Sequence, residues 1–192
     1  MKTSFLTPEE LRDIGFKSLG KNVLISRKAS VYSPELISVG NHVRIDDFCI
    51  VSGNVTLGSF IHVGSHTVLT GGSAGIEILD FANLSQRVNI FAGNDDYSGK
   101  TLTSPVVPDR FKNLEQAKVR IGRHVIIGCG SVVLPGVTMG EGSAVGALSL
   151  VNSDTESWMI YVGVPAKAVK ERSRELLKLE REFLASLEED NV

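Results

Sequence analysis

Aliphatic side chains recur at every sixth position over much of this chain of 192 residues. Glycine often follows directly, and small or branched residues such as Val43, Thr67 and Ser143 stand four positions later. Neither the 3.6-residue period of a helix nor the simple alternation of a long strand produces this spacing. The positions form three blocks: Val39, Ile45, Val51, Leu57, Val63 and Leu69; Ile78, Leu84 and Ile90; Ile121, Ile127, Val133, Met139, Val145 and Val151.

A six-residue unit made of a short strand and a tight turn explains the repeat. Three such units close a triangular coil of about 18 residues, and stacked coils form a parallel β-helix. A single repeat cannot bury its apolar face alone, so several coils must stack, and roughly five can be counted. The stacking predicts three neighbouring pairs in one interior column: Val39 with Leu57, Ile45 with Val63, and Ile121 with Met139.

The repeat resembles that of the hexapeptide-repeat acyltransferase superfamily, best seen in IGRHVIIGCGSVVLPGVTMGEGSAVGALSLV from Ile121 to Val151. The resemblance implies an all-β fold, a left-handed parallel β-helix, but it says little about the substrate because the same prism serves many acceptors. The length favours a single domain. We expect a helical cap over 1–18, a β-helix over 19–160 with a protruding loop at about 91–118, and a C-terminal helix over 161–192.

Both ends of the repeat carry helix signals. In LTPEELRDIGF, Thr7 as N-cap, Pro8 and Glu10 form a capping box, which predicts a short helix with Leu11 and Ile14 inward over the open end of the first coil. The charged segment VKERSRELLKLEREFLASLEED predicts a longer helix that packs on the prism or on a neighbouring subunit. Its apolar face holds Leu176, Leu179, Phe183 and Leu187.

Two segments interrupt the repeat. TGGSAG lengthens the spacing between Leu69 and Ile78 and predicts a bulge. A much longer insertion follows Ile90 and contains FAGNDDYSGKTLTSPVVPDRFKNLEQAKV. A loop of this length inside a regular solenoid is usually functional or disordered. Pro105 and Pro108 restrict the chain, which favours a functional loop.

The resemblance implies a catalytic site at the start of this loop. Galactoside, maltose and antibiotic acetyltransferases have a long loop at a comparable point, with the catalytic histidine at its start. The corresponding position here carries Asp95, and we expect Asn94, Asp96 and Tyr97 to bind the substrate. An aspartate is a weak base unless burial or a like charge such as Asp96 raises its pKa. His66, which resembles residues that line the acceptor pocket in the family, is the alternative base.

The two kinds of acceptor differ in whether their nucleophile needs a catalytic base. A hydroxyl requires a base, whereas an amine with a pKa near 8 is partly neutral at pH 7 and attacks without one. We expect a sugar O-acetyltransferase that moves an acetyl group from acetyl-CoA to a carbohydrate hydroxyl. The alternative is an N-acetyltransferase that acts on an amino sugar or a nucleotide-linked amino sugar.

The third block of the repeat resembles the coenzyme A side of the family. The family places the pantetheine arm between subunits, so the resemblance also implies a homotrimer. Small residues allow the cofactor to lie close to the backbone, and lysines are candidates for its phosphates. The residues implied for cofactor binding are Cys129, Ala147, Leu148, Asn152, Ser153, Ala166, Lys167 and Lys170.

Composition argues against other partners and leaves two rival classes. A net charge of -2 gives no basic footprint for nucleic acid, and no apolar stretch is long enough for membrane insertion, so we expect a cytoplasmic protein. Two cysteines indicate neither a disulfide framework nor a metal site, and no metal is expected. The rivals are a metal-dependent hydratase of the same fold, with His62, His66 and His124 as ligands, and a purely structural prism.

Overall fold

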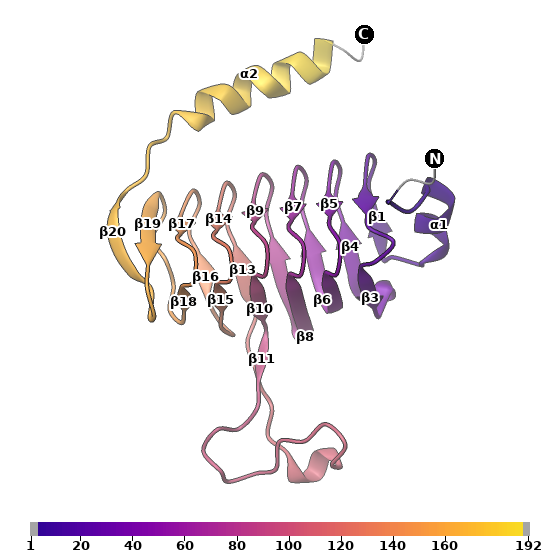
Figure 1. Cartoon of the computed structure of the whole chain (residues 1–192), viewed down its shortest axis with the longest axis vertical. Coiled ribbons are helices and arrows are strands. Elements are labelled where there is room, and N and C mark those ends of the chain that lie inside the picture. The colour runs from indigo at the N-terminus through magenta and orange to yellow at the C-terminus, as the bar shows by residue number, and fades with distance from the viewer. Residues whose placement is uncertain (1–3, 190–192) are drawn as a thin grey trace.

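The computed structural model describes residues 4–189, and its side chains up to Leu187, as a left-handed parallel β-helix with three faces (Figure 1). Two long strands, β6 (Ile50–Leu57) and β8 (Val68–Ile78), run from the third face around an edge to the first. The first face is completed by β1 (Ser18–Leu19), β4 (Ile37–Val39), β13 (Val119–Ile121) and β16 (Thr138–Met139).

The remaining parallel strands form the other two faces. The second face holds β2 (Leu24–Ile25), β5 (Arg44–Ile45), β7 (His62–Val63), β9 (Asn83–Leu84), β14 (Ile126–Ile127), β17 (Ala144–Val145) and β19 (Met159–Val162). The third face is completed by β3 (Ser30–Tyr32), β10 (Asn89–Phe91), β15 (Val132–Val133) and β18 (Leu150–Val151).

The interior column is confirmed. Every position of the three repeat blocks is at most 3% exposed, so these side chains converge on one core. The expected neighbours are direct partners in parallel register: Val39 with Leu57, Ile45 with Val63, and Ile121 with Met139. The expected bulge is also present, because the pairing of β6 with β8 shifts register around Gly53.

The β-helix begins one coil earlier than the counted blocks. Strands β1, β2 and β3 pair with β4, β5 and β6, respectively. Leu19, Ile25 and Val31 already follow the six-residue spacing, but the short 3₁₀ helix η1 (Pro34–Leu36) breaks the count before Val39. The count of repeat positions therefore left this coil out, although the β-helix expected over 19–160 includes it.

The N-terminal helix α1 (Pro8–Asp13) has the predicted capping box. The Glu10 backbone N–H donates to Thr7 Oγ1 at 3.3 Å, and the Thr7 N–H donates to Glu10 Oε2 at 2.7 Å. Leu11 is 4% exposed and belongs to the core, and Ile14 packs against it. The helix therefore covers the end of the solenoid, as its apolar residues indicated.

At the other end, β20 (Lys167–Glu171) pairs antiparallel with β19, and the chain then turns back into helix α2 (Leu176–Glu189). Helix α2 lies along the edge between the first and second faces (Figure 1). Aromatic rings stack along this edge, with centroids 4.7 Å apart for His42 and Phe60, 4.8 Å for Phe60 and Phe81, and 5.1 Å for Phe81 and His124. Phe183 of α2 meets two of these rings edge-on. The helix thus packs on its own prism.

Candidate functional site

The long loop leaves the prism where the third face ends. Strands β11 (Gly93–Asn94) and β12 (Glu115–Gln116) pair antiparallel and form its base, and the 3₁₀ helix η2 (Asp109–Phe111) lies in its outer part. Figure 1 shows the loop extending away from the prism, on the side opposite to α2. Asp95 directly follows β11, so the base of the loop determines where this side chain emerges.

The base of the loop is fastened to the bulge in β8. Gln116 Oε1 accepts hydrogen bonds from the Ser73 N–H at 2.9 Å, from Ser73 Oγ at 2.5 Å and from the Ala74 N–H at 3.2 Å. The Ala117 N–H also donates to the Ala92 carbonyl at 3.0 Å. The two interruptions of the repeat, which lie far apart in the sequence, therefore meet at one place.

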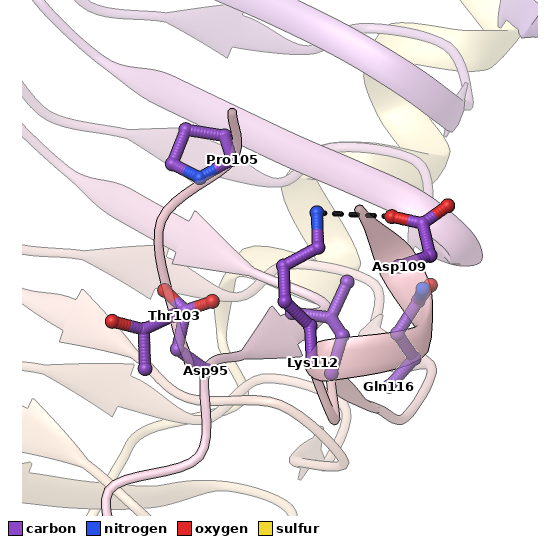
Figure 2. Close-up of a pocket in the computed structure, with 7 residues that line it drawn as sticks. Asp95, Thr103, Pro105, Asp109, Lys112 and Gln116 are labelled. Carbon is purple, nitrogen blue, oxygen red and sulfur yellow. Dashed lines mark ion pairs between the residues drawn. The ribbon is translucent and has the colours of Figure 1, made fainter. Parts of the chain in front are cut away.

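A hollow of about 510 Å³ lies on the loop. Figure 2 shows side chains from both ends of the insertion facing it, with a dashed line for the ion pair between Lys112 Nζ and Asp109 Oδ1 at 2.9 Å. The volume lies within the range typical of small-molecule sites. The lining residues are Asp95, Thr103, Pro105, Asp109, Lys112, Leu114 and Gln116.

The residues beside Asp95 differ in their surroundings. Asp96 uses both carboxylate oxygens within the loop, accepting from the Ser98 N–H at 2.8 Å and from Thr101 Oγ1 at 2.8 Å. These hydrogen bonds, that of Ser98 above all, lower the pKa of Asp96 to about 2. Asn94 belongs to β11, and Tyr97 is 89% exposed. Among these four candidates, Asp95 is the one that lines the hollow.

His66 lies at a different edge of the prism. It occupies the turn between β7 and β8, is exposed, and contacts the ring of Phe48 with centroids 5.0 Å apart. Because the start of β8 pairs in parallel with β10, His66 precedes the third face and Asp95 follows it. A single chain therefore holds the two candidate bases at opposite edges of one face.

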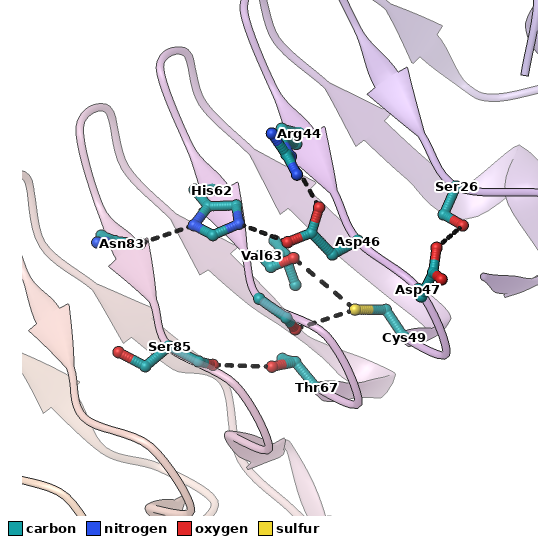
Figure 3. Close-up of polar contacts among 11 residues, drawn as sticks. Ser26, Arg44, Asp46, Asp47, Cys49, His62, Val63, Thr67, Asn83 and Ser85 are labelled. Carbon is teal, nitrogen blue, oxygen red and sulfur yellow. Dashed lines mark hydrogen bonds and ion pairs between the residues drawn. The ribbon is translucent and has the colours of Figure 1, made fainter. Parts of the chain in front are cut away.

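His62 is the histidine with the most polar neighbours (Figure 3). Its Nε2 lies 2.8 Å from Asp46 Oδ2 and its Nδ1 lies 3.2 Å from Asn83 Oδ1, while Arg44 Nε donates to Asp46 Oδ1 at 2.7 Å. Partial burial raises the pKa of Asp46, but the hydrogen bonds of His62 and Arg44 outweigh it and leave the pKa below its ordinary value. This network joins successive coils across the second face.

The described part of the chain contains no group of three or more His, Cys, Asp or Glu side chains arranged to hold a metal ion. His124, the third histidine of the hydratase alternative, is 7% exposed and pairs with Glu180 Oε2 of α2 at 2.9 Å. Its position is explained by the attachment of α2.

No helix among the described residues is long and apolar enough to cross a membrane.

The residues expected to bind coenzyme A occupy two edges. Cys129, Ala147 and Leu148 are exposed on one edge, where the Leu148 N–H donates to the Cys129 carbonyl at 2.9 Å. Ala166, close by, donates its N–H to the Leu150 carbonyl at 2.8 Å.

The other expected cofactor contacts lie on two separate segments. Lys167 and Lys170 lie on β20, whereas Asn152 and Ser153 follow β18 at the far side of the third face. The chain thus groups some of the candidates and separates the pair Asn152 and Ser153 from the rest.

Sequence reasoning missed most of the residues that line the hollow. Thr103, Asp109 and Lys112 come from the middle of the loop, and Gln116 comes from its return strand. No periodicity marks them, because the loop has none. The one available signal was their place inside the long insertion, of which the family resemblance marks only the first residues.

Comparison with known proteins agrees with the fold. Residues 118–153 match the family model Bacterial transferase hexapeptide (six repeats). An Escherichia coli dTDP-4-amino-4,6-dideoxy-D-glucose acyltransferase is 46% identical over 192 residues, with 98% of this chain and 100% of that protein covered. The putative O-acetyl transferase WbbJ of Escherichia coli K12 is 29% identical over 79% of this chain and 76% of its own length.

A solved structure is also similar to this chain over nearly its whole length. The N-acyltransferase AntD from Bacillus cereus, in complex with dTDP and 3-hydroxybutyryl-CoA, superposes with a TM-score of 0.94. It is 52% identical, and the match covers 97% of this chain and 100% of AntD. Other AntD structures contain dTDP-4-amino-4,6-dideoxyglucose and coenzyme A. The solenoid, the loop and the full-length similarity agree: this chain belongs to the hexapeptide-repeat acyltransferases.

Proposed function

We propose that the protein transfers an acyl group from acyl-coenzyme A to the 4-amino group of a dTDP-linked 4-amino-4,6-dideoxy sugar. The observation that carries this proposal is the full-length similarity to the Escherichia coli enzyme of that name and to AntD. The resemblance to galactoside, maltose and antibiotic acetyltransferases had favoured a hydroxyl acceptor. A galactoside O-acetyltransferase from Lactococcus lactis matches only 43% of this chain, so relatives support the amine alternative better.

The chemistry of an amine acceptor suits a loop without a histidine. A neutral amine attacks the thioester carbonyl through its lone pair, the C–S bond breaks as the amide forms, and coenzyme A leaves as a thiolate that takes up a proton. The attacking nitrogen carries positive charge until it loses a proton. A carboxylate next to the nitrogen stabilises that charge and orients the lone pair. For this role the carboxylate does not need the raised pKa that deprotonating a hydroxyl would require.

Asp95 is the residue we assign to this role. It lies at the start of the loop and faces the hollow, where the sugar end of the acceptor binds in this proposal. Asp96, by contrast, keeps both oxygens in hydrogen bonds within the loop. His66 lies at the opposite edge of the same face, so within one chain it does not share this hollow with Asp95.

We also propose a homotrimer with the cofactor between subunits. Apolar side chains are exposed around the expected cofactor residues, with Leu148 at 73%, Val164 at 70% and Val169 at 58%. Burial of such side chains against a neighbour or a pantetheine arm removes apolar surface from water. Analytical ultracentrifugation should give three times the mass of the chain; a monomer at micromolar concentration contradicts this part.

A matched pair of acceptors tests the reaction. The protein is incubated with acetyl-CoA or 3-hydroxybutyryl-CoA and with either dTDP-4-amino-4,6-dideoxyglucose or dTDP-6-deoxyglucose, which has a hydroxyl at the same carbon. We expect coenzyme A release and an acylated product only with the amine, and the product should withstand mild base because it is an amide. Acylation of the hydroxyl compound alone rejects the proposal.

A further inference from the structure

Lys112 is the one cationic side chain among the described residues that line the loop hollow. Its side chain is 20% exposed, and its ammonium group pairs with the carboxylate of Asp109 (Figure 2). The backbone of Lys112 is held in place, since its N–H donates to the Asp109 carbonyl at 2.9 Å and Lys112 forms a β-bridge with Leu102. The loop therefore presents this charge from a defined position.

The partner of Lys112 is easily displaced. The Asp109 side chain is fully exposed, at 100%, so water competes for its carboxylate. Exposed ion pairs of this kind contribute little to stability, because solvent screening and side-chain entropy offset the Coulomb attraction. A ligand with two phosphate groups offers more charge and more acceptor oxygens than one carboxylate.

We infer that Lys112 binds the diphosphate of a nucleotide-sugar acceptor. In this view the ion pair between Asp109 and Lys112 forms only while the site is empty. The inference rests on the proposed function and names the contact that recognises the nucleotide part of the substrate. The hollow carries one charge that suits each part of such a ligand. Lys112 faces the anionic diphosphate, and Asp95 faces the amine of the sugar.

A structural role for the ion pair makes a different prediction. If the contact between Lys112 and Asp109 only held the loop together, then removing either charge would weaken ligand binding. If Asp109 competes with the ligand, then removing the carboxylate strengthens binding while removing the cation weakens it. The sign of the Asp109 effect therefore separates the two roles.

The experiment measures the affinity of the full-length protein for thymidine diphosphate and for thymidine by isothermal titration calorimetry. We expect Lys112→Gln to weaken thymidine diphosphate binding about tenfold with thymidine binding unchanged. We expect Asp109→Asn to strengthen thymidine diphosphate binding about twofold. Lys100→Gln, on the same loop but outside this hollow, serves as the matched control and should leave both affinities unchanged.

Turnover provides a second measurement. For the amino sugar nucleotide, Lys112→Gln should raise KM and leave kcat within about twofold, and the KM for acyl-CoA should not change. Unchanged diphosphate affinity in Lys112→Gln, or weaker affinity in Asp109→Asn, overturns the inference. If wild-type protein acylates the amino sugar while Lys112→Gln keeps its KM, then the inference fails and the proposed function stands. Wild-type protein that neither binds nor acylates the nucleotide sugar overturns both.

Discussion

Two adjacent aspartates at the start of the loop have different roles in this structure. Asp96 is engaged on both oxygens by Ser98 and Thr101, whereas Asp95 faces the hollow. Hydrogen bonds within the loop lower the pKa of Asp96, which stays ionised and shapes the turn.

Replacing Asp95 tests its assignment. Asp95→Asn keeps the shape of the side chain but removes its charge, so we expect kcat to fall about 100-fold. The KM for acyl-CoA should stay within about twofold, since the change affects only the attacking amine. His66→Gln is the reciprocal variant, measured by the same release of coenzyme A. A large loss in His66→Gln beside normal turnover in Asp95→Asn would transfer the role of base to His66.

The acidity of Asp96 gives a pH prediction. Its pKa in the folded protein, about 2, lies below its ordinary value of 3.8, so its ionised form stabilises the loop. This stabilisation is complete above the unfolded pKa and is lost as the pH falls towards about 2. A carboxyl-carbon NMR titration should show Asp96 protonating well below its ordinary pKa of 3.8. Titration near pH 4 contradicts the hydrogen-bonded turn.

At the scale of elements, the structure joins segments that the sequence only marked as irregular. TGGSAG and the long insertion were both recognised as breaks in the repeat. Gln116 connects them, because its side-chain oxygen accepts three hydrogen bonds from the bulge. The bulge thereby supports the loop base and, through β11, the position of Asp95.

The Gln116 contact can be removed selectively. Gln116→Ala removes the oxygen that accepts these three hydrogen bonds. Each hydrogen bond contributes about 1 kcal/mol net to stability, so the base of the loop should open more often without them. Amide hydrogen exchange at Ser73 and Ala74 should accelerate at least about tenfold. Gln116→Glu is the control, since a carboxylate keeps the acceptor. Equal exchange rates in the Gln116→Ala variant and the wild type would show that the hydrogen bonds of Gln116 do not hold the loop base.

Helix α2 depends on the aromatic edge. Phe183 contacts Phe60 and Phe81, and Glu180 reaches Arg123 and His124. We expect Phe183→Ala to release the helix at a cost of about 1–2 kcal/mol, because the ring is partly buried. Faster hydrogen exchange across Leu176–Glu189 should report the release, while Arg181→Ala, an exposed position on the same helix, should not change it. Equal exchange rates of helix α2 in the Phe183→Ala and Arg181→Ala variants would contradict a role of Phe183 in anchoring the helix.

At the scale of the whole molecule, stability comes from the stacked interior. Each coil contacts mainly its neighbours, so a defect in the middle interrupts a continuous core. Adjacent residues of β6 offer a comparison: Leu57 is 2% exposed and points inward, whereas Thr56 is exposed. The inside and the outside of the prism can therefore be tested one residue apart.

We expect Leu57→Ala to lower the free energy of unfolding by about 3 kcal/mol, because it leaves a cavity between coils. Thr56→Ala should change it by less than about 0.5 kcal/mol. Urea denaturation followed by circular dichroism measures both values. Similar effects of the two substitutions would contradict an interior column at the repeat positions.

The sequence by itself determined the solenoid, its core and the places where it is interrupted, because a six-residue period is a local property that every coil repeats. It also determined the cap of α1, since a capping box needs only neighbouring residues. Only the tertiary structure decided that Gln116 fastens the loop to the bulge, that Asp95 and Lys112 share one hollow, and that His66 lies at another edge. These relations join residues far apart in the chain, and no local pattern encodes a distance across the fold.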